Sequence, residues 1–418
     1  GGEGEQAPPS GPKPIRVVTS STGQAYVGQF HAPELFGDKF GLAPNNQLTE
    51  FEDEGAAAQV LVSGGADAGS TGLTQVIQLI SRGQKLKAFC PVQVDSTEQL
   101  VGLSDKITSL DQITDPKIRV AVDSPGGLVN FIMNLVFRQK GMGVPVGDLQ
   151  NVTVLGDGSQ RLAALAARQV DVGSVDLFEL PDLQKQLGAD AVTTLSVTAA
   201  DADFLANIYY APTKWLDENT DLAGRFCAAT LYSNRVLASD YNQYKAAVDK
   251  YIEGGVDETI TKTNWDFARK HQVWPYNDDV MTPEALKTVI DVGVASGLLE
   301  SSAKDYTFAD IFDDRPLKIA MDLVGGPVSS EDVIAGKVPA PKRRRGSSGW
   351  SWPTMPSSMG PRRWRPKWRC GLSSPGRALP SRCCSPRKCA EIAVASKRQA
   401  CQIRPMHPCG PNQIEAQP

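Results

Sequence analysis

Small polar residues and glycines gather at four places where a predicted strand runs into a predicted helix. These residue types suit ligand binding, because a helix N-terminus presents unpaired N–H groups and a partial positive charge that together stabilise an anion by about 0.3 to 2 kcal/mol. A single serine at such a place often only caps its own helix. Four such places in one chain favour a shared ligand site. They are residues 20–23, 70–72, 123–127 and 156–159.

The elements that position these residues alternate between strands and helices. Apolar patterning predicts a strand at 15–19, a helix at 24–40, a strand at 47–51, a helix at 72–81 and strands at 87–94, 117–122 and 152–155. Gly41 and Gly83 are expected to end the two helices. This order predicts an α/β fold with a mainly parallel sheet covered by helices. In such sheets ligands bind beyond the carboxyl ends of the strands, where the polar residues stand.

Two stretches, residues 56–70 and 162–174, repeat one pattern of helix, turn and short strand. Small apolar residues let each helix lie close on a sheet, and a two-residue turn ends it. An aspartate, Asp67 or Asp171, then opens the strand. The repeat predicts two similar α/β lobes.

The end of the chain differs in charge from the rest. Residues 341–418 hold 16 of the 43 lysines and arginines but only 2 of the 47 acidic residues, so this segment is basic and the preceding part is acidic. No helical or strand period runs through it. We expect 331–418 to be a basic tail rich in Arg, Pro and Cys, either disordered or non-native. The alternative is a tail that binds nucleic acid through tryptophans placed between arginines, but we expect no nucleic-acid partner.

The cysteines divide between this tail and the preceding part of the chain. Six of the eight lie in the tail and form no Cys-x-x-Cys pair, so we expect no metal site. Cys90 and Cys227 are few enough for an exported domain, and they are either free and buried or paired. Residues 1–14, rich in Gly, Pro, Glu and Gln, predict a disordered leader or tether. No apolar run approaches the roughly 18 residues of a membrane span.

A series of short motifs resembles a known family. The motifs lie at 50–51, 55–57, 63–69, 79–83, 120–126, 156–158, 163–166 and 170–173. In order and spacing they resemble the solute-binding proteins of ABC transporters of the nitrate, sulfonate and taurine type, a group that includes binders of thiamine pyrimidine precursors. The resemblance covers about residues 15–325. It implies a type II periplasmic-binding-protein fold, in which two lobes enclose a central ligand cleft.

The resemblance also implies how the chain is divided. Lobe one is expected to consist of residues 15–98 and 208–330, and lobe two of residues 99–207. The chain is expected to cross between the lobes near 94–103 and to return near 205–211.

Carried onto this sequence, the resemblance implies a set of ligand-binding residues. They are Ser21, Thr22, Tyr26, Ser70, Thr71, Ser124, Gly126, Gly127, Asp157, Asp176, Phe178 and Tyr209. Either Tyr26 or His31, both on the first helix, is expected to stack on a flat ligand. The first loop lacks the Asn-His that many members of the family carry there. The ligand therefore stays open among a sulfonate, nitrate, taurine, a pyrimidine and an aromatic carboxylate.

The implied function is capture of a small anionic or heterocyclic solute by hinge closure, and its delivery to the permease subunits of an ABC importer. This role predicts a monomer in the periplasm or at the cell surface, a lipoprotein anchored to the membrane through its leader. The alternative is a pyrimidine-precursor synthase on the same fold, an enzyme with a cysteine-rich motif and a pyridoxal phosphate lysine. The folded part has only Cys90 and Cys227, and its polar loops hold no lysine. We therefore expect no enzyme, no catalytic residue and no cofactor.

Overall fold

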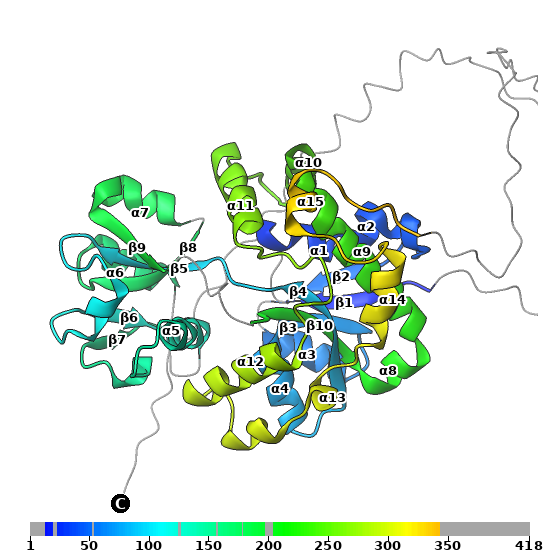
Figure 1. The fold of residues 1–418 in the computed structure, drawn as a ribbon, viewed down its shortest axis with the longest axis horizontal. Helices are drawn as coiled ribbons and strands as arrows, with labels where there is room; N and C mark the ends of the chain where they lie inside the picture. Colours follow the sequence, from blue (N-terminus) through cyan, green and yellow to red (C-terminus); the bar gives the residue numbers. More distant parts are fainter. Residues whose placement is uncertain are drawn as a thin grey trace, which may run out of the picture. The chain divides into compact units, whose positions relative to one another are not determined.

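The computed structural model describes residues 13–19, 23–51, 54–123, 127–155, 158–177, 179–196 and 204–342. The chain divides into two compact units, residues 1–348 and residues 349–418, and all of the described residues belong to the first unit. Residues 1–12 of the predicted leader and residues 343–418 of the predicted basic tail therefore lie outside the described residues. Figure 1 shows two sheets in the first unit, each with its own helices.

The first sheet has the strand order β2-β1-β3-β10-β4. Its strands are β1 (Arg16–Thr19), β2 (Gln47–Glu50), β3 (Ala68–Gly72), β4 (Leu86–Gln93) and β10 (Asn207–Pro212). β1 pairs in parallel with β2 and β3, whereas β10 is antiparallel to both of its neighbours. The helices between these strands are α1 (Val27–Phe30), α2 (Ala32–Phe36), α3 (Glu54–Val62) and α4 (Leu73–Ser81). The carboxyl ends of β1 and β3 consequently lie at one edge of the sheet.

The second sheet repeats this arrangement with the order β7-β6-β8-β5-β9. Its strands are β5 (Glu98–Leu103), β6 (Val120–Val122), β7 (Val152–Val154), β8 (Val172–Asp176) and β9 (Val192–Ser196). β6 pairs in parallel with β7 and β8, and β5 is antiparallel to β8 and β9. The helices of this part are α5 (Leu128–Gln139), α6 (Gly158–Ala166) and α7 (Leu180–Leu187). The predicted α/β class and the two-lobe architecture are confirmed.

The same ion pair opens a central strand in each sheet. In the first sheet, the Arg16 backbone N–H donates to Asp67 Oδ2 at 2.9 Å and the Arg16 guanidinium donates to Oδ1 at 3.0 Å. In the second sheet, Arg119 makes the same two bonds to Asp171, at 2.9 and 2.8 Å. The aspartate of each sequence repeat thus ties its own strand, β3 or β8, to the parallel neighbour.

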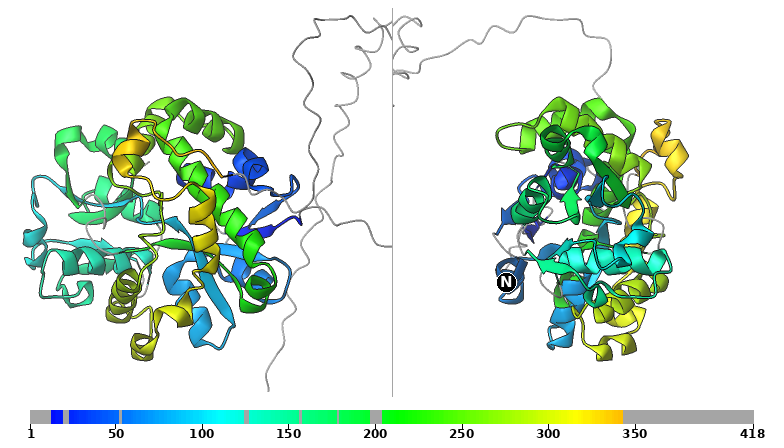
Figure 2. Two further views of the ribbon diagram at one scale, coloured as in Figure 1. Left: turned by 45° about the vertical axis from the view of Figure 1, so that its right-hand side comes forward. Right: turned by 90° about the vertical axis from the view of Figure 1, so that its left-hand side faces the viewer.

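The last part of the described chain is helical. Its helices are α8 (Thr213–Glu218), α9 (Thr220–Ser239), α10 (Tyr241–Tyr251), α11 (Glu258–Lys270), α12 (Pro283–Ala295), α13 (Phe308–Ile311), α14 (Arg315–Leu323) and α15 (Ser330–Ile334). α9 is buried over most of its length, and α2, α10 and α14 pack against it. Figure 2 shows these green and yellow helices from two further sides. Among the described helices, none is long and apolar enough to cross a membrane.

A disulfide joins the first sheet to the long helix α9. Cys90 of β4 and Cys227 of α9 are both fully buried, and their Cα atoms lie 5.7 Å apart. Of the two alternatives left open for these cysteines, the structure contains the paired one. The bond connects residues that are 137 positions apart in the sequence.

The predicted helix at 24–40 is wrong in its continuity. The structure has four short pieces there, namely η1 (Gln24–Tyr26), α1, α2 and η2 (Gly37–Phe40). Pro33 lies in the first turn of α2 and has no N–H for the hydrogen-bond ladder of α1, so the helix is interrupted at His31. Gly41 ends the series as predicted, with a φ of 67° that favours glycine. The remaining 3-10 helices are η3 (Leu110–Thr114), η4 (Val146–Asp148), η5 (Ala189–Ala191) and η6 (Ser301–Asp305).

The predicted start of the basic tail at 331 is also wrong. Residues 331–342 continue the folded unit, because Val333 of α15 is fully buried in an apolar cluster. The Lys342 backbone N–H donates to the Leu323 carbonyl at 2.8 Å, and the Lys342 ammonium pairs with Asp322 at 2.9 Å. The acidic residues within 331–342 belong to this folded segment. The boundary was misplaced because the average charge of residues 331–418 is basic.

Candidate ligand-binding site

A pocket of about 550 Å³ is lined by residues of both sheets. Its walls come from η1 and α1, from the end of β3 and the start of α4, from the segment between β4 and β5, from the start of α5, from the end of β8, and from the segment that leads into β10. The pocket therefore lies at the carboxyl ends of β3 and β8, where the order of the strands predicts a ligand.

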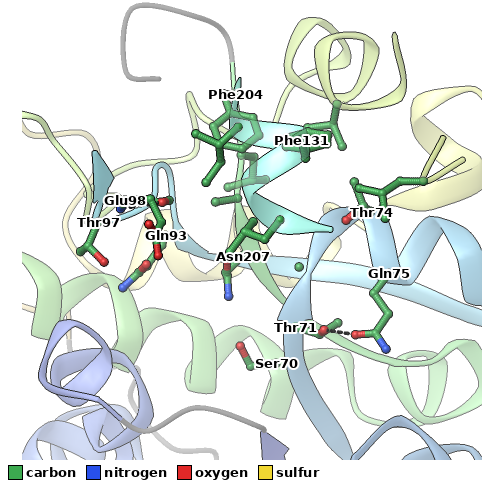
Figure 3. A pocket seen from close by; sticks show the side chains of 18 of the residues that line it. Ser70, Thr71, Thr74, Gln75, Gln93, Thr97, Glu98, Phe131, Phe204 and Asn207 are labelled. Carbon is green, nitrogen blue, oxygen red and sulfur yellow. Dashed lines mark hydrogen bonds between the residues drawn. The ribbon is translucent and has the colours of Figure 1, made fainter. Parts of the chain in front are cut away.

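The wall at the end of β3 is polar and buried. Ser70 and Thr71 are each only 4% exposed, and the Thr71 hydroxyl donates to the side-chain oxygen of Gln75. The Ser70 hydroxyl is buried and has no hydrogen-bond partner among the described residues. Leaving a buried hydroxyl unsatisfied costs about 1 to 3 kcal/mol. A water or a ligand in the pocket is the natural partner for it. Figure 3 shows Ser70, Thr71 and Gln75 in this wall.

Two carboxyl groups stand in the wall that the second sheet contributes. Glu98 of β5 and Asp176 of β8 are direct partners in the antiparallel register. The Thr97 hydroxyl donates to Asp176 Oδ2 at 2.8 Å, and the Ser174 hydroxyl donates to Glu98 Oε2. In Figure 3, Glu98 and Thr97 lie at one end of the pocket, and Thr71 and Gln75 lie at the other.

The environment of Glu98 favours its protonated form. Burial is the main cause that raises the pKa of Glu98 from its ordinary value of 4.5 to about 7, and the charge of Asp176 raises it further. The hydrogen bond from Ser174 and the charge of Arg161 act in the opposite direction. A carboxyl group with a pKa near 7 changes its charge within the physiological range, which is typical of functional sites.

Two aromatic pairs supply the apolar part of the pocket. Tyr26 and Phe30 stack with their ring centroids 5.1 Å apart, and Phe131 and Phe204 stack at 5.7 Å. The Asn207 side-chain amide donates to Tyr26 Oη at 3.2 Å and so fixes that ring. Aromatic rings in the lining suit a flat solute, because offset ring stacking contributes about 0.5 to 1.5 kcal/mol beyond the area that it buries.

The N-terminus of α5 lies at the pocket, and two of its backbone donors are already engaged. Asp123 accepts hydrogen bonds from the backbone N–H groups of Val129 and Asn130, at 2.9 and 2.8 Å. Gly127, which lines the pocket, permits this close approach, because a Cβ atom there would lie 2.1 Å from Asp123 Oδ2. The chain's own carboxylate thus occupies the place where an anion would bind.

The structure brings together five of the predicted site residues. Tyr26, Ser70, Thr71, Gly127 and Asp176 all line the pocket. Six others lie outside the described residues, namely Ser21, Thr22, Ser124, Gly126, Asp157 and Phe178. The ligand contacts of all these residues stay predictions.

Two residues that were predicted to contact the ligand, Tyr209 and His31, do not line the pocket. Tyr209 is fully buried beneath α1 and outside the pocket lining, and its hydroxyl donates to the Gln29 carbonyl at 3.0 Å. His31 lies outside the lining as well, because its ring stacks on Tyr251 with centroids 3.7 Å apart. Of the two side chains expected to stack on a ligand, only Tyr26 reaches the pocket.

Several lining residues were missed from the sequence. They are Thr19, Phe30, Gln93, Thr97, Glu98, Phe131, Phe204 and Asn207, among others. Residues 88–103 hold two acidic residues, Asp95 and Glu98, and no basic one, so the sequence alone does not single out Glu98. Phe131 lies in an apolar helix, where sequence alone does not separate a pocket residue from a core residue.

Comparisons with known proteins agree with this architecture. Residues 46–240 match the family described as NMT1/THI5 like, which confirms the family resemblance inferred from the motifs. A comparison with curated proteins gave no match.

Solved structures share the fold at low sequence identity. The periplasmic sulfonate-binding protein SsuA from Methylobacillus flagellatus KT has a TM-score of 0.57 at 16% identity, over 79% of this chain and 98% of that chain. The aliphatic sulphonate binding protein SsuA from Escherichia coli has 0.54 at 16% identity, over 84% and 98%. The nitrate-binding protein NrtA from Synechocystis PCC 6803 has 0.52 at 14% identity, over 79% and 93%. At these identities the similarity shows the periplasmic-binding-protein fold.

Proposed function

We propose that this chain is the extracytoplasmic solute-binding component of an ABC importer, which captures a small solute between two lobes and delivers it to a permease. The observation that carries this proposal is the pocket, whose walls come from both sheets. A solute there contacts both lobes at once, and it favours whichever arrangement gives it the most contacts. Periplasmic binding proteins are standard examples of such hinge closure. The sulfonate and nitrate binders among the similar structures support the transport role.

The segment between β4 and β5 has the features of a hinge. The Val94 N–H donates to the Val273 carbonyl at 2.8 Å, whereas the Thr97 carbonyl accepts from the Leu177 N–H at 3.0 Å. The two ends of this four-residue connection are therefore held by different parts of the unit, and Asp95 and Ser96 lie between them. The chain returns to the first sheet between β9 and β10. Two connections allow rotation of one lobe against the other without unfolding either sheet.

The buried disulfide supports an extracytoplasmic location. Bonds such as Cys90–Cys227 form and persist in oxidising compartments and are rare in the cytosol. We include in the proposal a monomer, a lipid anchor preceding residues 1–14, and binding without catalysis. Mass spectrometry of the native N-terminus tests the anchor, and the recovery of an unchanged ligand tests the absence of turnover.

A thermal-shift screen tests the proposed function. The panel holds sulfonates, nitrate, taurine, pyrimidines, aromatic acids and aromatic amines. A ligand at 100 times its Kd raises the free energy of unfolding by about 2.7 kcal/mol, and hinge closure lowers the radius of gyration in X-ray scattering. A panel without any thermal shift or change in scattering contradicts the proposal.

A further inference from the structure

The pocket has acidic groups but no basic residue in its lining, among the residues that the structure describes. The internal segments that the structure does not describe cannot supply a basic side chain either, because they contain no Lys, Arg or His. These segments are 20–22, 52–53, 124–126, 156–157, 178 and 197–203. A site for a free anion would gain most from charged N–H donors. No described residue in the pocket lining carries such a charged donor.

Two of the backbone donors that could replace such a cation, at the N-terminus of α5, are already engaged. The N–H groups of Val129 and Asn130 donate to Asp123, as described above. An anionic solute at this end of α5 would have to displace a carboxylate of the chain itself, and would meet its negative charge.

The pairing of Glu98 with Asp176 is unfavourable for the empty protein. Like charges placed directly opposite each other destabilise a strand pair, by roughly 0.2 to 1 kcal/mol. Burial of Glu98 adds a second penalty, which appears as its raised pKa. Both effects lower the stability of the empty protein. Both are relieved by a positive group placed between the carboxylates.

The charged groups around Glu98 leave room for that positive group. Asp176 of β8 and Glu179, at the start of α7, both disfavour its charge, and Arg161 of α6 favours it. The Arg161 guanidinium donates to the Leu155 carbonyl at 2.8 Å and lies outside the pocket lining. Arg161 thus acts on the charge of Glu98 without lining the pocket.

The rest of the pocket fits the body of an aromatic solute. Tyr26 with Phe30 and Phe131 with Phe204 present ring surfaces, and the buried Ser70 hydroxyl has no partner among the described residues. A ring that carries a cationic nitrogen group also gains a cation–π contribution from such surfaces. In Figure 3, Ser70 lies apart from Glu98 and Thr97, so its hydroxyl is available to a second polar group of the solute.

We propose that the pocket takes a flat aromatic solute with a positively charged nitrogen group, which binds between Glu98 and Asp176 while its ring lies against the two aromatic pairs. This inference rests on the proposed function and selects one solute class within it. On this inference the pocket favours such a cation over simple anions such as a sulfonate or nitrate.

Three compounds of nearly equal shape separate charge from size. Benzamidine is a cation, benzamide is neutral and benzoate is an anion, and all three are planar. We expect benzamidine to bind with a Kd at least tenfold lower than that of benzamide, and benzoate to show no binding in calorimetry. Tighter binding of benzoate, or binding of none of the three compounds, overturns the inference.

Two substitutions with a matched control place the charge in the pocket. Glu98→Gln and Asp176→Asn each remove one carboxylate without changing the shape of the side chain, and each should weaken benzamidine at least tenfold but benzamide less than twofold. Glu179→Gln removes a nearby charge that does not line the pocket, and should change both affinities less than twofold. If Glu98→Gln and Glu179→Gln weaken benzamidine binding equally, the carboxylates act through their long-range charge and not through contact with the ligand. That result overturns the inference.

The pH dependence gives a readout with a definite sign. Benzamidine stays charged between pH 5.5 and pH 8, whereas Glu98 loses its proton over this range because its pKa is about 7. The affinity for benzamidine should therefore rise about tenfold from pH 5.5 to pH 8, and Glu98→Gln should abolish the rise. An affinity that falls with pH would mean that protonated Glu98 donates to an acceptor, which overturns the inference.

The two proposals fail separately. A sulfonate or nitrate that produces a thermal shift and a smaller radius of gyration leaves the transport role standing and removes the cationic solute. A panel without any ligand removes the transport role itself.

Discussion

At the scale of single residues, Glu98 links the stability of the empty protein to its pH. The pKa of Glu98 lies at about 7 in the folded chain and at the ordinary 4.5 in the unfolded chain, so the folded state holds the extra proton between these values. Stability therefore falls as the pH rises from 4.5 through 7. Glu98→Gln removes this loss, and at pH 8 it should raise the free energy of unfolding by at most about 3 kcal/mol. Urea denaturation of variant and parent at pH 4.5 and pH 8 measures the difference.

Two comparisons make this result specific. For Glu179→Gln, the difference in free energy of unfolding between variant and parent should be the same at pH 4.5 and at pH 8. If the stability of Glu98→Gln relative to the parent stays constant with pH, water reaches Glu98 and its pKa is ordinary. The gain in stability should accompany a loss of ligand affinity, as expected where a binding site carries strain.

The residues of the pocket divide into those that local sequence can indicate and those that only tertiary contacts can. Ser70, Thr71 and Asp176 end short strands that lead into helices, and this local order is visible in the sequence. Tyr209 lies beyond Asn207 in β10, where the ring of Phe30 is 6.2 Å away and α1 covers it. The packing of a helix from residues 27–30 on a strand from residues 207–212 leaves no periodic trace in either segment.

At the scale of elements, the repeated ion pair predicts an unequal loss of stability in the two sheets. The Asp171 side chain is 2% exposed and that of Asp67 is 17% exposed. Asp171→Ala removes a buried acceptor from the Arg119 backbone N–H, whereas the Arg119 guanidinium is exposed and can bond to water. We therefore expect a loss of about 1.5 to 3 kcal/mol, against at most about 1 kcal/mol for Asp67→Ala, whose carboxylate is more exposed. Chemical denaturation of both variants at pH 7 measures the two losses. Equal losses would mean that the burial of the aspartate has no effect.

The pH dependence of the Asp171 contribution has the opposite sign to that of Glu98. Burial alone would raise the pKa of Asp171, but its hydrogen bonds with Arg119 outweigh burial and hold the pKa below the ordinary 3.8. The stabilisation is therefore complete above pH 3.8 and is lost as the pH falls through the lower pKa of the folded state. The difference between Asp171→Ala and the parent should shrink in acid.

An ion pair between α5 and α12 is expected to hold the two walls of the pocket together. Arg138 of α5 pairs with Asp291 of α12 at 3.3 Å, and Lys287 pairs with the same carboxylate at 2.7 Å from within α12. Both cations are exposed, so each pair contributes at most about 1 kcal/mol. Arg138→Gln should weaken solute binding up to about fivefold, whereas Lys287→Gln, which leaves the contact between the helices, should not. If Arg138→Gln binds the solute more tightly than the parent, the ion pair between Arg138 and Asp291 stabilises the ligand-free arrangement instead.

Elements with a clear period and clear end signals were predicted well. The strand at 15–19 and the helix at 72–81 agree with β1 and α4 within one residue at each end. The segment 24–40 keeps apolar residues at helical spacing, but Pro33 and tertiary packing divide it into short pieces. Apolar spacing reports which side is buried, and does not report whether the backbone hydrogen bonds are continuous.

At the scale of the whole molecule, the repeat in the sequence was sufficient for two sheets of equal topology. It was not sufficient for the solute. The charge of the pocket depends on Glu98 and Asp176 being placed opposite each other, and that register joins residues 78 positions apart. The family resemblance implied an anionic or heterocyclic solute, and the polar strand ends independently suggested helix N-termini that are free to bind an anion. The bonds from Val129 and Asn130 to Asp123 show that one of these termini is occupied.

A pair of truncations locates the end of the folded unit. A chain that stops after Lys342 keeps α15 and the bonds of Lys342 to Leu323 and Asp322, and loses a segment without an apolar period. Its melting temperature should equal that of the full chain. A chain that stops at Ser330 loses the buried Val333, whose side chain alone contributes about 1.5 to 3 kcal/mol. Its melting temperature should fall by several degrees.

The comparison between the two truncations is sharper than either alone, because they differ only in residues 331–342. Both variants keep the lining residues of the pocket, so their affinity for a common ligand should agree with that of the full chain. Equal melting temperatures for the two variants would place the end of the unit before α15. A fall already in the longer variant would mean that residues 343–418 stabilise the fold.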